Sequence, residues 1–373
     1  MTTPSFIPVS QPSIGEKELA YVTDAVRSGW VSSLGRYIEE FEHRFADFCG
    51  TRFAVSASNG TTALHLALLA VGIEKGDEVI VPDLTFIATA NAVAYIGAVP
   101  VTVDIDAETL CISPAAIEKA ITPRTRAILP VHLYGHPADM DPINAIAERH
   151  SLVVVEDAAE AHGAEYRGGR VGSLGRCGMF SFYGNKVITS GEGGMITTDD
   201  EAVYLKARRL RDHAMSAAKR YWHEEVGYNY RMTNLQAALG VAQLERIDEF
   251  AARRSEIMGW YREDLQGRPG LRLNRTKPWA KNAHWMVCLE VEGMDEGVRE
   301  RLMTALRERG VDSRPYFYPV SDMPMYSAAE TPVAHRISAC GINLPSFVDL
   351  SRDDVRHVCR QVELCIRDVV VSR

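Results

Sequence analysis

Short apolar runs alternate with helix-like segments between about residues 55 and 200. Runs such as EVIVP (78–82) and LVVV (152–155) are rich in β-branched residues and have the length of buried strands. Between such runs, TTALHLALLAV (61–71) is apolar on nearly every side and is typical of a covered helix. The expected strands are 78–82, 100–103, 126–131, 152–155, 179–183 and 195–197, and the expected helices are 61–71, 88–96 and 141–150. Wholly apolar strands interleaved with helices predict an α/β fold, with a mostly parallel sheet covered by helices on both faces.

The pattern changes after a long amphipathic segment, 234–251, which we expect to continue through 253–266 with a break. Beyond it we expect strands at 285–289 and 311–318, a helix at 298–309 ended by Gly310, and a final amphipathic helix at 352–369. This part is typical of a smaller α+β unit. A chain of 373 residues is also longer than most single domains. We therefore predict a large domain over 1–250 and a small C-terminal domain over 251–373.

Composition and charge narrow the possible partners. The formal net charge is -8 and no basic block stands out, so nucleic acid is not an expected partner. No apolar run approaches the roughly 20 residues of a membrane span, and the N-terminus lacks the pattern of a signal peptide. The seven cysteines are scattered without a C-x-x-C pair, which favours a reducing cytoplasm and argues against a disulfide framework or a metal site.

Two candidate chemical groups follow apolar segments in the first part of the chain. Ligands of such sheets bind beyond the C-terminal ends of the strands, so residues at these ends matter most. Asp157 stands at the end of VVVED, where a carboxylate could face a pyridine nitrogen or could simply begin a solvated turn. Lys186 lies in the aromatic, Gly-flanked segment SFYGNKVITSGEGG, where desolvation would free its amine for attack, although a surface hairpin is the alternative.

Two further features precede these groups. Ser58-Asn59-Gly60-Thr61-Thr62 stands directly before a predicted helix, whose N-terminus can bind an anion or be an ordinary helix cap. Phe86 follows the strand EVIVP and could stack on a flat ring or belong to the core. The chain lacks the glycine patterns of P-loop and Rossmann dinucleotide sites. The chain thus contains a possible phosphate-binding turn, then an aromatic residue, an acid and a lysine. This order fits a site for pyridoxal 5′-phosphate (PLP).

The sequence resembles the DegT/DnrJ/EryC1/StrS family of nucleotide-sugar aminotransferases over nearly its whole length. The matching segments are SNGTTALHLAL (58–68), GDEVIVPDLTFIATANAV (76–93), PVHLYGHPADM (130–140), VVVEDAAEAHGA (153–164), FSFYGNKVITSGEGGM (180–195) and GYNYRMTNLQAALGVAQL (227–244). The resemblance implies the type I PLP-dependent, aspartate-aminotransferase-like fold. Within the family, RYWHEEVGYNYRMTN (220–234), SRPYFYPVSDMPMYS (313–327) and GINLPSF (341–347) resemble the GDP-perosamine synthase branch.

The family resemblance implies a role for each residue that matches its motifs. It makes Lys186 the catalytic lysine that forms the Schiff base with PLP, and Asp157 the partner of the pyridinium nitrogen. It places Gly60, Thr61 and Ser181 at the phosphate, Phe86 on the ring, and Asn229 at the phosphate of a neighbouring subunit in a homodimer. Glu160 matches a position near the phenolic oxygen where many members carry Gln, so it is protonated there or contacts another group.

The residues expected at the substrate come from two segments of the chain, and they are Arg220, Tyr221, Trp222, His223, Arg231, Arg314 and Tyr316. Four of them have a structural alternative. Arg231 could pair with an acid, Tyr221 and Trp222 could pack at a loop base, and Arg314 could be paired within a strand or bind a carboxylate or phosphate. His162 is expected to be a core histidine rather than a catalyst.

The resemblance implies that L-glutamate donates an amino group to C4 of a nucleotide-linked 4-keto-6-deoxy sugar. The GDP-perosamine branch favours GDP-4-keto-6-deoxy-D-mannose, a reaction of O-antigen lipopolysaccharide or natural-product glycosylation. The alternatives are the same reaction on a UDP- or dTDP-linked sugar, and a non-catalytic binding protein on the same fold. PLP-dependent sugar dehydratases of the family carry His at the position of Lys186, so the lysine argues against that reaction.

Overall fold

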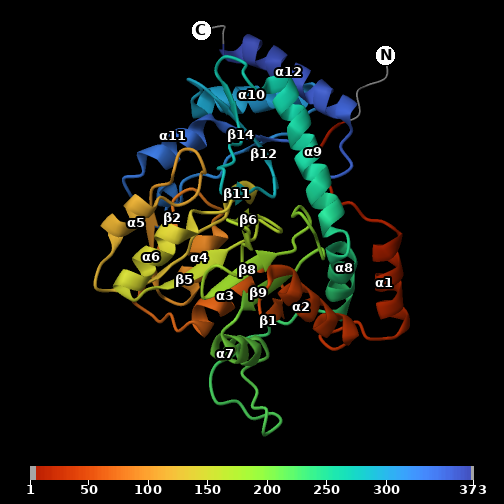
Figure 1. Ribbon diagram of the computed structural model, residues 1–373, viewed down its shortest axis with the longest axis vertical. Coiled ribbons are helices and arrows are strands. Elements are labelled where there is room, and N and C mark those ends of the chain that lie inside the picture. The colour runs from red at the N-terminus through yellow and green to blue at the C-terminus, as the bar shows by residue number, and fades with distance from the viewer. Residues whose placement is uncertain (1–5, 371–373) are drawn as a thin grey trace.

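A seven-stranded sheet forms the centre of the larger part of the molecule in the computed structural model, which describes residues 6–370 (Figure 1). Its strand order is β1-β9-β8-β5-β4-β2-β3, and only β9 runs against the others. The strands are β1 (Phe53–Ala57), β2 (Glu78–Pro82), β3 (Val99–Val103), β4 (Thr125–Ile128), β5 (Val153–Asp157), β8 (Cys177–Ser181) and β9 (Gly194–Thr198). The predicted mostly parallel sheet is confirmed.

Helices cover both faces of this sheet because successive side chains of each strand point to opposite sides. On β2, Ile80 packs in the cluster that includes residues of α5 and α6, whereas Val79 and Val81 pack in the cluster that includes α3. The helices around the sheet are α2 (Arg36–Cys49), α3 (Gly60–Ala70), α4 (Ala88–Tyr95), α5 (Pro114–Ala120), α6 (Met140–His150) and α7 (Glu201–Arg211). Strands buried on both faces explain why their sequences are apolar without alternation.

Two consecutive helices, α8 (Asn234–Leu244) and α9 (Ile247–Leu265), lead from the sheet to the C-terminal part (Figure 1). The break between them falls at Glu245 and Arg246, several residues before the position expected from the amphipathic pattern. The proposed domain boundary at residue 250 therefore lies inside α9. In Figure 1, α9 runs from α8 up to the layer formed by α10 and α12.

The C-terminal part contains a four-stranded antiparallel sheet in the order β10-β12-β14-β13. Its elements are β10 (Leu271–Leu273), β12 (Val287–Val291), α10 (Glu296–Glu308), β13 (Arg314–Pro315), α11 (Pro332–Cys340), β14 (Gly341–Leu344) and α12 (Arg352–Val370). The predicted strand 311–318 is wrong in extent, since only Arg314 and Pro315 pair with β14. Beyond Pro315 the backbone turns toward the larger part, and the Phe317 N–H is donated to the Tyr134 hydroxyl.

Several short segments tie the two parts together. The three-stranded sheet β11-β6-β7 joins β11 (Ala280–Lys281) to β6 (Glu165–Tyr166), with β7 (Gly169–Arg170) on its other side. Near the N-terminus, before α1 (Glu16–Arg27), the Ile7 N–H is donated to the Gly310 carbonyl, and the Ile7 side chain packs in the C-terminal apolar cluster. The chain therefore crosses between the two parts more than once.

Three expectations about environment concern the described residues. None of the helices formed within 6–370 is long and apolar enough to cross a bilayer. All seven cysteines are buried and unpaired, and no cluster of potential metal ligands occurs in the described part of the chain. Residues 1–5, part of the segment in which no signal peptide was expected, lie outside the described residues.

Candidate active site

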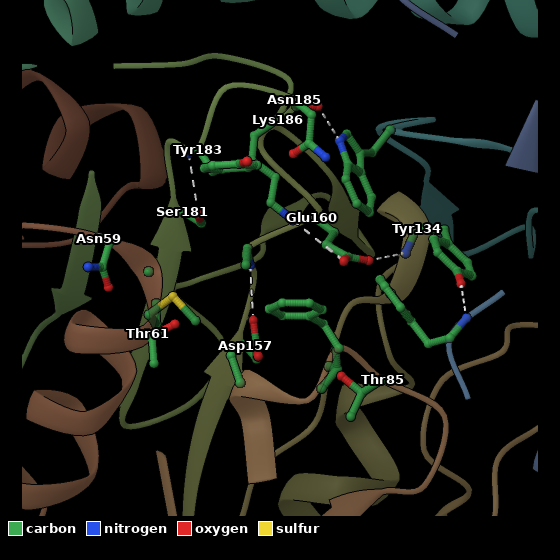
Figure 2. Close-up of a pocket in the computed structure, with 18 of the residues that line it drawn as sticks. Asn59, Thr61, Thr85, Tyr134, Asp157, Glu160, Ser181, Tyr183, Asn185 and Lys186 are labelled. Carbon is green, nitrogen blue, oxygen red and sulfur yellow. Dashed lines mark hydrogen bonds and ion pairs between the residues drawn. The ribbon is translucent and has the colours of Figure 1, made fainter. Parts of the chain in front are cut away.

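A cavity of about 700 Å³ opens at the C-terminal ends of the parallel strands (Figure 2). Its wall comes from α3, from the segments after β2, β5 and β8, and from the C-terminal part of the chain. Eight of the predicted site residues border it, namely Gly60, Thr61, Phe86, Asp157, Glu160, Ser181, Lys186 and Arg314. Asn59 and Thr62 of the predicted phosphate turn border it as well. The positions at strand ends singled out in the sequence are thus brought to one place.

The N-terminus of α3 forms one end of the cavity. The Asn59 side-chain oxygen accepts the Thr62 N–H at 2.9 Å, which caps the helix and leaves the first-turn N–H groups of Gly60 and Thr61 toward the cavity. A Cβ added at Gly60 would lie 2.7 Å from the Ser181 Cβ, so only glycine permits this close approach of α3 to β8. Exposed amides at the positive end of a helix dipole, next to a serine hydroxyl, suit a phosphate group.

Asp157 is the acid that faces the cavity at the end of β5. It is 5% exposed, its Oδ2 accepts the Thr89 hydroxyl at 2.8 Å, and its Oδ1 accepts the Ala159 N–H at 3.2 Å. Burial raises the pKa of Asp157, while the bond from Thr89 and the charge of Lys186 oppose that rise. A cationic partner in the cavity would therefore stabilise the buried carboxylate further.

The neighbouring acid, Glu156, points the other way. Its Oε2 lies 2.9 Å from His132 Nε2, and its two oxygens also accept backbone N–H groups from the turn at 172–175. The sequence analysis selected Asp157 of these two adjacent acids. The alternation of the strand agrees with that selection, because it directs Glu156 into the protein and Asp157 to the cavity.

Lys186 and Glu160 face each other across the cavity, with Nζ 3.5 Å from Oε1 (Figure 2). The other oxygen of Glu160 accepts the Tyr134 N–H at 2.9 Å. Burial lowers the pKa of the Lys186 amine, and it raises the pKa of Glu160 to about 7, although the two opposite charges counteract both shifts. Glu160 can therefore hold a proton near neutral pH, which the sequence had left open as one of two possibilities.

Two aromatic residues that the sequence interpretation did not select also border the cavity. Trp285 places its ring under the Lys186 amine, with Nζ 3.9 Å from the ring centroid. Tyr134 has φ of +53°, an uncommon conformation for a tyrosine, and this turn directs its N–H to Glu160. The only sequence signal was the Gly after Tyr134 in HLYG, because an isolated Trp carries no functional pattern.

Arg314 brings a cationic group to the cavity from β13. No carboxylate within residues 6–370 forms an ion pair with its guanidinium, and Arg314 is the only arginine among the described residues that border the cavity. Phe86 is 53% exposed and lies against Phe317, with ring centroids 5.7 Å apart. The cavity thus offers an unpaired cation and an open aromatic face.

The other predicted substrate residues do not border the cavity within one chain. Arg220, Tyr221, Trp222, His223, Asn229 and Arg231 lie in the connection between α7 and α8, part of which extends away from the sheet below α7 in Figure 1. At its end this connection returns to the sheet, where the Ser58 N–H is donated to the Tyr230 carbonyl. Arg231 forms an ion pair with Asp212 and donates a hydrogen bond to the Asn229 side-chain oxygen at 3.1 Å. This pairing with an acid is the structural alternative that the sequence left open for Arg231.

Tyr316 and His162 are core residues in this chain. Tyr316 is 1% exposed and packs against the Tyr134 ring with centroids 5.2 Å apart, which leaves it outside the cavity wall. Pro315 and Phe317, its neighbours, face the cavity instead. His162 is fully buried against Phe180 and Phe182, and burial lowers its pKa to about 3.

The residues present in the cavity fit PLP. The N-terminus of α3 with Ser181 suits the phosphate, Phe86 offers a face for the ring, Asp157 suits a protonated ring nitrogen, and Lys186 supplies an amine for the aldehyde. The close approach of Gly60 to Ser181 is an independent sign, since it gathers the amide and hydroxyl donors into one cradle.

Comparisons with known proteins agree with this arrangement. The DegT/DnrJ/EryC1/StrS aminotransferase family profile matches residues 12–363. The GDP-perosamine synthase of Caulobacter vibrioides is 50% identical over 94% of this chain and 96% of its own, and that of Escherichia coli O157:H7 is 45% identical over 96% and 98%. The PLP form of Spr1654 from Streptococcus pneumoniae, assigned as a sugar aminotransferase, superposes with a TM-score of 0.93 at 28% identity, covering 98% of this chain and 99% of its own.

Proposed function

Because the chain belongs to the DegT/DnrJ/EryC1/StrS aminotransferase family and is a PLP-dependent sugar aminotransferase, we propose that it makes GDP-perosamine. The reaction transfers the amino group of L-glutamate to C4 of GDP-4-keto-6-deoxy-D-mannose. This substrate assignment rests on the identity of 42–50%, over nearly the full length, with three GDP-perosamine synthases. The cavity supports amino transfer, because it combines a buried amine, a buried acid and a helix end suited to an anion.

The proposed roles follow from where each side chain lies. When bound, PLP supplies an electrophilic carbon for amines and a ring that accepts electrons. Asp157 holds the ring nitrogen protonated from the end of β5, and Gly60, Thr61 and Ser181 bind the phosphate. Phe86 supports the ring from one side and Arg314 binds a carboxylate of the amino donor or a phosphate of the sugar nucleotide.

Lys186 is the proposed acid–base group. Its amine takes the proton from the α-carbon of the donor and, in the second half of the reaction, gives a proton to C4 of the sugar. Burial lowers the pKa of Lys186, so a larger fraction of the amine is neutral and able to accept a proton at neutral pH. Glu160 lies 3.5 Å from this amine and can take up or release the proton that the amine exchanges.

A second subunit completes the proposed site. Asn229 is exposed and does not border its own cavity, and the aromatic residues Tyr221 and Trp222 near it are 75% and 52% exposed. Large exposed aromatic side chains on a protruding segment are typical of a surface that another chain covers. We place Asn229 at the cofactor phosphate of the partner subunit of a homodimer, with Arg220 and His223 near the nucleotide sugar.

The decisive experiment is a turnover assay of the purified protein with L-glutamate and a panel of GDP-, UDP- and dTDP-linked 4-keto-6-deoxy sugars. We expect kcat/KM for GDP-4-keto-6-deoxy-D-mannose to exceed the others by at least about a hundredfold, or about 2.7 kcal/mol. Lys186→Ala should abolish both turnover and the visible absorption of bound PLP that glutamate bleaches. A preference for a UDP- or dTDP-linked sugar would reassign the nucleotide, and bound PLP that glutamate never bleaches would indicate a non-catalytic protein.

A further inference from the structure

Trp285 comes from the C-terminal part of the chain but forms a wall of the cavity beside Lys186. It is 4% exposed, and its backbone carbonyl accepts bonds from the Arg254 guanidinium of α9 at 2.8 Å and from the Ser346 hydroxyl at 3.0 Å. Its ring lies nearly parallel to the Tyr134 ring, with an interplanar angle of 22° and centroids 6.2 Å apart. The indole is therefore held in one orientation from both sides.

The same indole touches Lys186 in two ways. Its Nε1–H is donated to the carbonyl of Asn185, the residue before Lys186, at 2.7 Å. Its face receives the Lys186 ammonium, with Nζ 3.9 Å from the ring centroid, which is well within the distance of a favourable cation–π contact. One side chain therefore fixes both the backbone that carries the lysine and the position of its amine.

The charges around the amine do not by themselves hold it at this place. Glu160 and Asp157 attract the ammonium, whereas Arg314 repels it, and burial keeps His162 neutral. The nearest carboxylate oxygen is 3.5 Å away, so no short ion pair fixes Nζ. The ring face supplies a further attraction, with its centroid 3.9 Å from Nζ, without introducing a second charge that would compete for the cofactor.

We propose that Trp285 is a positioning residue for Lys186, which keeps the free amine beside Glu160 whenever it is not bonded to the cofactor. This inference rests on the proposed role of Lys186 and adds a second element to it. A transferred proton needs its base within hydrogen-bond reach, and a lysine has four flexible side-chain bonds. The indole face limits that freedom, and its N–H limits movement of the turn at 183–186.

The test uses purified full-length protein freed of cofactor, so that the Lys186 amine is free and the result does not depend on the substrate. Trp285→Phe keeps an aromatic face but loses the N–H, and Trp285→Leu loses both at nearly the same volume as Phe. The fraction of Lys186 that reacts with an amine-acetylating reagent is measured against pH by mass spectrometry. Hydrogen–deuterium exchange of residues 183–187 is measured on the same samples.

An aromatic face stabilises the ammonium, so its loss lowers the pKa of Lys186. We expect the labelling midpoint to lie about one pH unit lower in the Leu variant than in the Phe variant, a roughly tenfold rise in reactive amine at a fixed pH below both midpoints. Both variants should exchange amide hydrogens at 183–187 faster than the wild type. Because both substitutions remove the indole N–H, the comparison between them isolates the ring face.

Trp279→Leu provides the matched control, because Trp279 is a half-buried tryptophan of the same region that packs on His136 and Tyr166 and does not border the cavity. It should leave the Lys186 midpoint and the exchange at 183–187 at their wild-type values. Equal midpoints in the Phe and Leu variants would overturn the role of the ring face, and unchanged exchange would overturn the role of the N–H. Neither result would touch the proposed substrate, which only the turnover assay decides.

Discussion

At the scale of single residues, the site depends on how burial distributes protons among three groups. Asp157, Glu160 and Lys186 border one cavity, and burial raises the pKa of the two carboxyls and lowers that of the amine. Such opposed shifts keep a proton donor and a proton acceptor available near neutral pH. The raised pKa of Glu160, about 7, is the shift with the clearest consequence for stability.

Glu160→Gln should therefore change how stability depends on pH. The folded protein holds a proton on Glu160 up to about pH 7, whereas the unfolded chain releases it near 4.5, so the stabilisation is fully present below 4.5 and is lost as pH rises to 7. Relative to the Gln variant, the cofactor-free wild type should lose up to about 3 kcal/mol of unfolding free energy over that interval. Urea unfolding at pH 5 and pH 8 measures the difference.

The control for this prediction is Glu292→Gln, which removes an exposed carboxyl outside the cavity. It should run parallel to the wild type across the same pH interval. If the gap between the wild type and Glu160→Gln stayed constant from pH 5 to pH 8, Glu160 would not be the group that takes up a proton on folding.

At the scale of elements, the anion end of the cavity depends on the contact between α3 and β8. The two elements approach so closely at Gly60 that a methyl group there would meet Ser181. The asparagine cap at Asn59 starts α3 at the point where its first amides face the cavity. The anion-binding property therefore belongs to the junction of two elements rather than to the SNGTT segment alone.

Gly60→Ala should weaken PLP binding. The added Cβ would displace Ser181 and separate the hydroxyl from the α3 amides, and overpacking of this kind costs about 1–3 kcal/mol. We expect the Kd for PLP to rise by about tenfold or more, measured by the visible absorption on titration with the cofactor.

Gly259→Ala on α9 is the matched control, because a Cβ there has no neighbour within 4 Å. It should leave PLP affinity unchanged and stabilise α9 by about 0.5–1 kcal/mol. Equal PLP affinity in both alanine variants would contradict the assignment of the phosphate to this junction.

At the scale of the whole molecule, the question is whether one chain holds a complete site. Six predicted residues in the connection between α7 and α8 do not border their own cavity, and part of this connection projects from the body of the chain (Figure 1). A two-fold dimer would place this connection of each subunit at the cavity of the other. In such a dimer the same surface patch of both subunits forms the interface, so each contact occurs twice.

Mixing two inactive variants tests this arrangement. Co-expressed Lys186→Ala and Asn229→Ala chains should form heterodimers in which one of the two sites has Lys186 from one chain and Asn229 from the other. Random pairing would restore about a quarter of wild-type turnover per chain. The turnover assay on co-expressed and separately purified proteins measures the recovery. Absence of any recovery, with dimers present by light scattering, would place Asn229 in the site of its own chain.

The sequence alone determined the fold class, the cofactor and the acid–lysine pair, because these depend on local patterns. Buried parallel strands are apolar along their length, and the residues that follow them face the ligand edge of the sheet. The positions of Asp157, Lys186, Phe86 and the SNGTT segment at strand ends or turns were therefore enough to predict that they meet. Their meeting in one cavity needed no long-range information beyond the order of the strands.

Only the tertiary structure decided which neighbours these residues have. It placed Tyr316 in the core, shortened the predicted strand 311–318, and brought Trp285 beside Lys186. Trp285 is distant from Lys186 in the sequence, and their contact arises because residues in and next to β12, β13 and β14 of the small sheet border the cavity. Local pattern encodes which face of an element is covered, but packing between elements decides what covers it.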